Sequence, residues 1–286
     1  MLALFSVAVR AQQPASSCEA CEEWNRPQGP FQIFANTYYV GPRGLSVILI
    51  TSDQGHVLID GALPESAAAI ASSVRALGFK VEDIRVILNS HAHFDHAGGI
   101  AELQRLSGAT VMATPWSASV FTSGVVPRSD PQFGVAPPIA AAQNVKSVKD
   151  GDTVRLGPLA LTAHETPGHT PGGTSWTWRS CAGADCADLL YVDSLTAVSA
   201  DGFLFTRNRE YPGAVADFEK TFDRLERVAC GILLTPHPEA SGLWQRLERR
   251  ERGDPEAMSD PPACRRLVEG ARERVRQRLA AEAGAP

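Results

Sequence analysis

The chain has 286 residues, 44% of them hydrophobic, and a formal net charge of -5 at pH 7. A chain of this length can bury about 75% of its unfolded surface in one or two domains. It has no lysine- or arginine-rich run, so nucleic acid is not an expected partner. No stretch approaches the ~20 apolar residues that a membrane span needs, so no membrane partner is expected either.

The first residues are apolar and predict an export signal. Residues 1–11 read MLALFSVAVRA and offer small residues at plausible cleavage positions. The segment has no basic start, so a fortuitous apolar N-terminus is the alternative. We expect residues 1–17 to be a leader and residues 18–286 to form a single domain, exported to the periplasm.

Hydrophobic patterning predicts alternating strands and helices along the chain. Strands are expected at residues 31–41, 45–52, 57–60, 86–88 and 110–113, and helices at 64–77 and 100–106. Residues 127–143, rich in Pro, Ala and Gly, are expected to form a long surface loop that could wall a substrate site. Residues 145–197 are expected to be mostly β, followed by helices at 215–228, 243–249 and 264–281.

The order of these elements predicts an α/β fold. A β-rich segment followed by α, β, α and β elements precedes a second β-rich segment followed by α, β and α elements. The two halves resemble each other, and each supplies candidate metal ligands. We therefore expect a four-layer αβ/βα sandwich, with two β-sheets packed face to face, helices outside and the site at the shared edge.

The chain has six cysteines, and their surroundings indicate local and long-range disulfides. One pair flanks a short turn between two strand-like runs, and another could tie the C-terminal helix to the strand before His237. A Cys-x-x-Cys near the N-terminus lacks the strand and helix of a redox motif, so a local disulfide is the better interpretation. The expected pairs are Cys181–Cys186, Cys230–Cys264 and Cys18–Cys21. Disulfides agree with export, because they persist in oxidising compartments.

The motif His91-Ala92-His93-Phe94-Asp95-His96 carries the most chemical information in the chain. Imidazole and carboxylate groups are ligands for Zn²⁺ and similar metals. His91 and His93 are two residues apart, so on an extended segment both point the same way. Asp95 and His96 follow where the chain turns, and can aim at a second point nearby. The motif therefore predicts parts of two adjacent metal sites; the alternative is a polar surface turn.

Four further histidines lie outside this motif. His169, in a Pro-Gly-rich break between strand-like runs, and His237, directly after an apolar run, are candidate ligands on short fixed loops. His56 opens a strand and His164 ends one, and we interpret both as structural.

The His-x-His-x-Asp-His pattern resembles the signature of the metallo-β-lactamase superfamily, and Pro167-Gly168-His169-Thr170 and His237 resemble its later ligand motifs. That superfamily includes glyoxalase II, lactonases, nucleases and sulfatases. The segments at 36–41, 172–178 and 191–201 resemble the third subclass of class B β-lactamases, and the resemblance runs from about residue 31 through nearly the whole chain. Other zinc β-lactamase subclasses have a cysteine ligand where this chain has Ser194.

This resemblance implies a site and an activity. It implies two Zn²⁺ per chain, one held by His91, His93 and His169 and the other by Asp95, His96 and His237. It also implies that Asp95 orients a metal-bound hydroxide, and that Ser194 and Thr196 bind the substrate carboxylate. The implied activity is hydrolysis of the β-lactam amide bond of penicillins, cephalosporins and carbapenems, giving antibiotic resistance; we expect a monomer.

Two alternatives remain open. The first is a hydrolase of the same fold that acts on a thioester or lactone, as glyoxalase II does; Asp193 would then bridge the metals. No basic cluster near the ligand loops favours a glutathione tail, and the surrounding match favours Asp193 outside the metal shell. The second is an inert metal-binding or scaffold protein, which the complete ligand set argues against.

Overall fold

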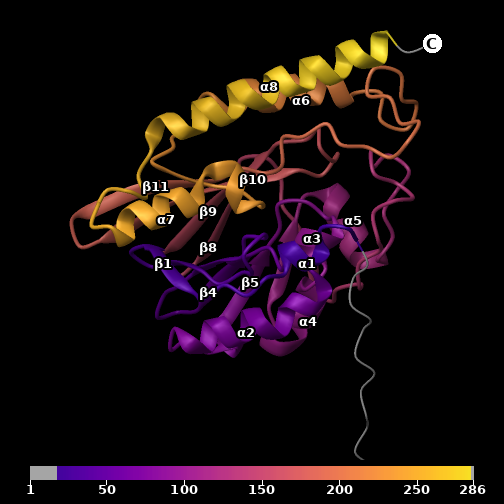
Figure 1. Cartoon of the computed structure of the whole chain (residues 1–286). Coiled ribbons are helices and arrows are strands. Elements are labelled where there is room, and N and C mark those ends of the chain that lie inside the picture. Colours follow the sequence, from indigo (N-terminus) through magenta and orange to yellow (C-terminus); the bar gives the residue numbers. More distant parts are fainter. Residues whose placement is uncertain (1–17, 285–286) are drawn as a thin grey trace, which may run out of the picture.

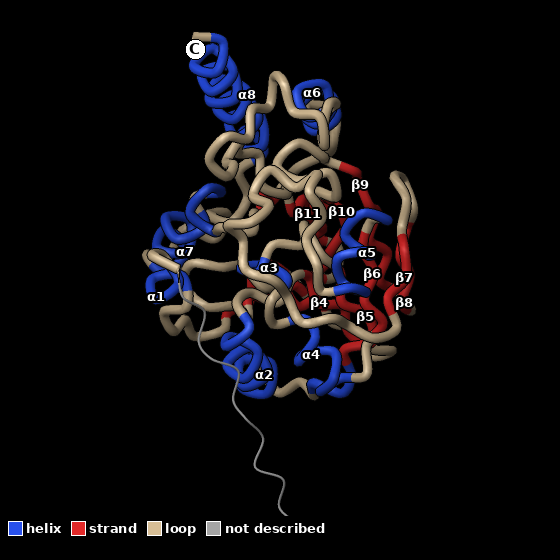
Figure 2. The backbone as a smooth tube through the Cα atoms, turned by 90° about the vertical axis from the view of Figure 1, so that its right-hand side faces the viewer, coloured by secondary structure: helices blue, strands red, loops and turns tan. Residues whose placement is uncertain are grey.

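Two β-sheets packed face to face form the centre of the computed structural model, which describes residues 18–284 (Figure 1). The expected leader, residues 1–17, lies outside the described residues. One sheet has seven strands and the other has five. Separate apolar clusters attach helices to the outer face of each sheet, which confirms the expected four-layer α/β sandwich (Figure 2).

The seven-stranded sheet is antiparallel at one side and parallel at the other. Its strands are, in spatial order, β1 (Phe31–Phe34), β2 (Thr37–Tyr39), β3 (Ile48–Ile50), β4 (His56–Ile59), β5 (Ile84–Leu88), β6 (Thr110–Ala113) and β7 (Val145–Ser147). Strands β4 to β7 run parallel, so the loops that follow β4, β5 and β6 meet at one edge. The helices on its outer face are α2 (Ala67–Ala76), α4 (Ile100–Ser107) and α5 (Pro115–Ser123).

The five-stranded sheet is antiparallel apart from its β11–β12 pair. Its strands are, in spatial order, β12 (Ile232–Leu234), β11 (Asp185–Tyr191), β10 (Thr174–Ala182), β9 (Leu159–Glu165) and β8 (Thr153–Leu156). The outer helices α6 (Ala214–Leu225) and α8 (Pro261–Ala283) lie side by side over this sheet (Figure 1). Helix α7 (Leu243–Glu251) packs into the core between the sheets, and the short helices are α1 (Cys21–Trp24) and α3 (Phe94–Ala97).

Two buried tryptophans of β10 join the sheets through their indole N–H groups. Trp176 Nε1 donates to the carbonyl of Asn89 at 3.0 Å, and Trp178 Nε1 donates to Thr37 Oγ1 at 3.1 Å. Both acceptors belong to the opposite sheet or to its loops. Because a buried N–H group without an acceptor is unfavourable, these bonds set the position of one sheet on the other as well as filling the core.

Most expected elements are present, and three differ. The expected strand at 31–41 is a hairpin, because β1 and β2 pair across a turn in which Ala35 has φ of 44°. Helix α5 was not expected; it begins at Pro115, and Gly124 ends it in the left-handed conformation. The expected β-rich region extends only to Tyr191, since the chain from 192 to 213 forms a loop.

The three expected disulfides are confirmed: Cys18–Cys21, Cys181–Cys186 and Cys230–Cys264. The last one anchors the first turn of α8 to the segment before β12. None of the helices within residues 18–284 is long and apolar enough to cross a membrane.

A buried carboxylate holds the strand ends beneath the histidine motif. Asp60, which follows β4, has no exposed surface and a φ of 64°. Its Oδ1 accepts hydrogen bonds from Ser90 N at 2.7 Å and Asn89 Nδ2 at 3.0 Å. Its Oδ2 accepts from Ser90 Oγ and Tyr191 OH, both at 2.7 Å. Asp60 thus joins the ends of β4 and β5 to β11 of the other sheet.

We expect Asp60→Ala to lower the free energy of unfolding much more than Asp60→Asn. Alanine leaves buried donors without an acceptor, at roughly 1–3 kcal/mol for each one that finds no replacement. Asparagine keeps the acceptor for Ser90 N, and its amide can donate to the two hydroxyl oxygens. Urea denaturation measures the free energy of unfolding of both variants, with exposed Asp53→Ala as the control. Equal losses for Asp60→Asn and Asp60→Ala would contradict the role of Asp60 as a hydrogen-bond acceptor.

The same comparison has an expected pH dependence. Burial raises the pKa of Asp60 to about 6, so its ionisation opposes folding. Stability from the protonated form is therefore present at low pH and is lost as the pH rises through the folded-state pKa. Asp60→Asn has no such group, so it should gain stability relative to the wild type between about pH 4 and about pH 7.

Candidate metal centre

The candidate ligands gather where the ends of the two sheets meet. His91 and His93 follow β5, and Asp95 and His96 lie in the short helix α3. His169 comes from the loop between β9 and β10, in the other half of the chain. A backbone hydrogen bond of 2.8 Å from Thr174 N to Ser90 O joins the His91 segment to β10. The fold itself therefore brings distant ligands together.

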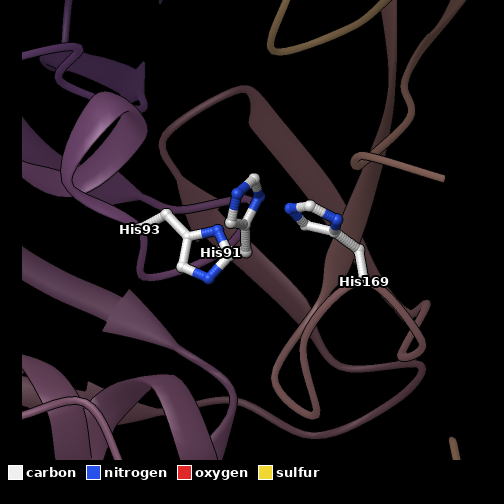
Figure 3. Close-up of side chains that lie close together, drawn as sticks. All are labelled: His91, His93 and His169. Carbon is white, nitrogen blue, oxygen red and sulfur yellow. The ribbon is translucent and has the colours of Figure 1, made fainter. Parts of the chain in front are cut away.

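His91, His93 and His169 form one compact set. Their potential ligand atoms all lie within 4.8 Å of one another, and the three side chains are buried. Figure 3 shows the three imidazoles facing a common point, two from one half of the protein and His169 from the other. The ring centroids of His91 and His169 are 4.7 Å apart, and those of His93 and His169 are 5.0 Å apart.

Two of these rings are held from behind by hydrogen bonds to their Nδ1 atoms. His91 Nδ1 lies 2.7 Å from Asp193 Oδ1, and His169 Nδ1 lies 2.8 Å from the carbonyl oxygen of Thr196. These acceptors place the proton on Nδ1 and leave the Nε2 lone pair free. His91 Nε2 is buried and has no hydrogen-bond partner within the described residues. Such an orphaned lone pair is unfavourable unless a metal ion takes it, so the site fits a metal.

His93 is held through its other nitrogen. Its Nε2 lies 3.0 Å from Asp130 Oδ1, so Nδ1 is the nitrogen whose lone pair can face a metal. The Nε2 atom of Gln132 lies 3.3 Å from that Nδ1. Asp130 is fully buried and also accepts a hydrogen bond from the backbone N–H of Gln132 at 2.7 Å. The expected loop at 127–143 therefore reaches into the centre.

The protonation states favour metal binding near neutral pH. Burial, with the nearby charges of His96 and His93, holds the pKa of His91 well below its usual range. Burial, with a smaller contribution from the neighbouring His91 and His93, lowers the pKa of His169 to about 3. These two imidazoles are therefore neutral and need not release a proton to bind a metal. Burial alone would lower the pKa of His93, but the hydrogen bond and charge of Asp130 raise it on balance.

Asp95, His96 and His237 form a second set beside the first. His96 Nε2 lies 3.1 Å from Asp95 Oδ2, and His237 Nε2 lies 3.5 Å from the same oxygen. Tetrahedral ligands on bonds of ~2.0–2.1 Å would be about 3.3 Å apart, so these spacings fit a shared zinc-sized ion. Atoms of His91, Asp95 and His96 also lie within 4.8 Å of one another, so the two sets adjoin.

The Asp95 carboxylate is ionised in this environment. Burial would raise its pKa, but His96 and His237 outweigh that effect and hold the pKa well below its usual range. His237 is the outermost member of the set, with 34% of its side chain exposed. The second set is therefore more open to solvent than the first.

Both sets open into one cavity of about 500 Å³. Trp24 of α1 forms a wall, with its ring centroid 5.2 Å from that of His237. Ser194 and Thr196, the expected substrate-binding residues, both line the cavity. Thr196 also lies behind His169, with its Oγ1 3.1 Å from His169 Nδ1.

The structure supports the interpretation of the other two histidines. His164 lies on β9 with its Nε2 2.8 Å from Thr177 Oγ1 on β10, a bond between neighbouring strands. His56 begins β4 and packs against Phe79 with ring centroids 5.1 Å apart. Neither residue lines the metal cavity.

Several residues of the centre were not anticipated. No sequence motif includes Trp24, Asp130 or Gln132, and Asp130 lies in a loop without hydrophobic periodicity. The only local signal at Trp24 is its position three residues after the Cys18–Cys21 pair. Their roles arise from long-range packing, which sequence spacing does not record.

The sequence and the structure agree on the family. The chain matches the family model described as the metallo-beta-lactamase superfamily over residues 40–258. It therefore belongs to the metallo-β-lactamase superfamily, and the His91, His93 and His169 cluster is its metal-binding site.

Two solved structures narrow the similarity. Rm3 metallo-beta-lactamase is 52% identical, with 93% of this chain and 99% of that chain covered and a TM-score of 0.91. MEM-A1, a subclass B3 metallo-beta-lactamase from a soil metagenome library, is 51% identical, with coverages of 91% and 98% and a TM-score of 0.89. The expected resemblance to the third subclass is confirmed.

A more distant similarity is partial. The hydroxyacylglutathione hydrolase of Methylobacterium nodulans is 33% identical over 130 residues, which are 46% of this chain and 42% of that protein. The chain thus spans about two fifths of the length of this curated relative.

We expect Asp130→Ala to weaken Zn²⁺ binding by roughly 10–100-fold, the usual effect of removing a hydrogen-bond partner of a ligating histidine. Asp130→Asn keeps an acceptor for His93 Nε2 and should lose less. Competition of the metal-free protein with a chromogenic chelator measures the affinity, and far-UV circular dichroism verifies the fold. Exposed Asp201→Ala is the control; unchanged affinity in Asp130→Ala would refute the role.

Proposed function

We propose that this protein is a zinc-dependent β-lactamase that hydrolyses the amide bond of penicillins, cephalosporins and carbapenems. The observation that carries the proposal is the compact His91, His93 and His169 cluster, with Asp95, His96 and His237 in contact beside it at one cavity. The similarity to subclass B3 metallo-beta-lactamases, over nearly the whole of both chains, supports it.

Two Zn²⁺ are the proposed cofactors. His91, His93 and His169 hold one, and Asp95, His96 and His237 hold the other. Zinc in such a site lowers the pKa of coordinated water toward ~7 and polarises a carbonyl group. The ligand spacings and the orphaned nitrogen of His91 support this assignment.

The protein side chains position the reaction. Asp95, the proposed catalytic residue, is held as a carboxylate, so it can orient the attacking water by accepting a hydrogen bond from it. Ser194 and Thr196 donate hydrogen bonds to the substrate carboxylate, each worth roughly 1 kcal/mol or somewhat more. Ser194 binds substrate and forms no covalent intermediate.

We further propose that the protein acts after export, in the periplasm. All six cysteines are in disulfides, as expected for an oxidising compartment. Export also places the enzyme where β-lactams arrive, so the proposed activity would give antibiotic resistance.

A thioester hydrolase is the second candidate, favoured by the partial similarity to hydroxyacylglutathione hydrolases. In that alternative Asp193 would bridge the metals. Its Oδ1 instead lies 2.7 Å from His91 Nδ1, the nitrogen that faces away from the metal. This position supports Asp193 as the group that orients His91.

We expect the zinc-loaded protein to hydrolyse a carbapenem and a chromogenic cephalosporin in the presence of clavulanate, because no acyl-enzyme exists for clavulanate to trap. Chelation by EDTA should abolish turnover, and added Zn²⁺ should restore it. A lactone and a glutathione thioester are assayed with the same preparation. Brisk thioester or lactone hydrolysis without β-lactam turnover would decide for the second candidate.

We expect His237→Ala to lower the zinc content toward about one ion per chain, because each catalytic zinc needs three protein ligands. β-Lactam turnover should fall by at least about tenfold, the low end of what even an outer-shell change costs. His164→Ala is the matched control, since it removes a half-buried histidine and its hydrogen bond outside the cavity. Metal content that survives the first change but not the second would reverse the assignment.

A further inference from the structure

The long C-terminal helix α8 forms part of the wall of the metal cavity. Leu267 and Arg274 of this helix both line it. Among the lining residues within 18–284, Arg274 is the only lysine or arginine, whereas Asp95, Asp193 and Glu239 are acidic. A substrate in the cavity can therefore reach the positive charge of Arg274, whereas the other charged side chains of the wall, histidines apart, are acidic.

Within residues 18–284, Arg274 lacks the ion pair that most other arginines of α8 form. Most other arginines of the helix form ion pairs: Arg266 with Asp260, Arg272 with Glu219, Asp223 and Glu226, Arg276 with Glu273, and Arg278 with Glu282. No ion pair or hydrogen bond of the Arg274 side chain occurs within residues 18–284. Its guanidinium is free to bind an anion.

The helix leaves room for this side chain. A Cβ atom at Gly270, one turn earlier, would lie 3.3 Å from Arg274 Nη1. The guanidinium thus lies over a position without a side chain. A glycine inside a helix costs roughly 0.5–1 kcal/mol of stability relative to alanine, so Gly270 is unfavourable for the helix itself.

The position of Arg274 indicates which part of a substrate it meets. Arg274, Leu267 and Glu239 also line a second surface pocket, between α7 and α8, which contains none of the proposed metal ligands. Arg274 therefore lies at the rim where the two hollows adjoin. The carboxylate next to the lactam ring is already assigned to Ser194 and Thr196, and Thr196 lies beside His169 at the metal centre. Arg274 at the rim is therefore left for another part of the substrate.

We propose that Arg274 is a specificity-determining residue that binds an anionic group on the acyl side chain of the substrate. This inference rests on the proposed β-lactamase function. A guanidinium can bind a carboxylate through two parallel hydrogen bonds, which a point charge cannot. The side chain is exposed, so the contact is worth only the modest amount of a solvated ion pair.

The test compares two penicillins that differ by one charge. Benzylpenicillin and carbenicillin share the ring system, the ring carboxylate and the phenyl group, and carbenicillin adds a carboxylate to the acyl side chain. In Arg274→Ala, the ratio of kcat/KM for carbenicillin to that for benzylpenicillin should fall roughly two- to fivefold, mainly through KM. High salt should shrink the change, because it screens exposed charges.

Two further variants sharpen the result. Arg265→Ala is the matched control, since Arg265 is an exposed α8 arginine that lines neither hollow; the ratio should not change. Glu239→Gln removes an acidic group from the same rim and should raise the ratio. Opposite shifts for Arg274→Ala and Glu239→Gln would tie the effect to charge at this rim.

Each other outcome overturns the inference. An equal loss for both penicillins means that Arg274 meets the shared ring carboxylate or acts through the fold. No change for either means that the side chain stays in solvent. If the zinc-loaded wild-type protein hydrolyses neither penicillin, the proposed function fails first and the inference falls with it.

Discussion

Three imidazoles can share a metal ion only if each directs a nitrogen lone pair toward it. Here a hydrogen bond to the other nitrogen of each ring sets that orientation. Two carboxylates and one backbone carbonyl accept the hydrogen bonds that fix the His91, His93 and His169 tautomers. The acceptors belong to Asp193, Asp130 and Thr196, in the loop after β11 and the loop after α5. Those otherwise irregular loops are therefore constrained by the metal centre that they support.

The histidine motif also depends on a hydrogen-bonded carboxylate in the core. Asp60 lies beneath the histidine motif and accepts hydrogen bonds from both sheets. Burial raises its pKa to about 6, so the fold retains a carboxyl group in an environment that disfavours its charge. That arrangement is stable only because four donors converge on the two oxygens. The same buried carboxylate therefore fixes the position of one sheet on the other and the position of the segment that carries His91 and His93.

The sequence predicted best what a local pattern records. The histidine motif, β6 and the two short-range disulfides follow from patterns whose chemistry or periodicity is specific, and Cys230–Cys264 is the long-range contact that the sequence also predicted. The turn at Ala35 and helix α5 were missed because neither has a distinctive pattern. Asp130 and Arg274 were missed for another reason: each acquires its role from a contact with a segment far along the chain. No spacing rule relates such residues.

The charges of the cavity predict that substrate binding depends on metal binding. Its wall contains three acidic residues, whereas burial keeps His91 and His169 neutral at ordinary pH. Without bound cations the interior therefore disfavours an anion, and every penicillin carries a carboxylate. Divalent ions held at the centre, as proposed above, would reverse that sign close to the reacting bond. The effect of those ions weakens toward the solvent-filled rim, because water and salt screen it. A second charge on a substrate side chain therefore needs a cation of the protein's own, and Arg274 is the one lysine or arginine among the described residues that line the cavity.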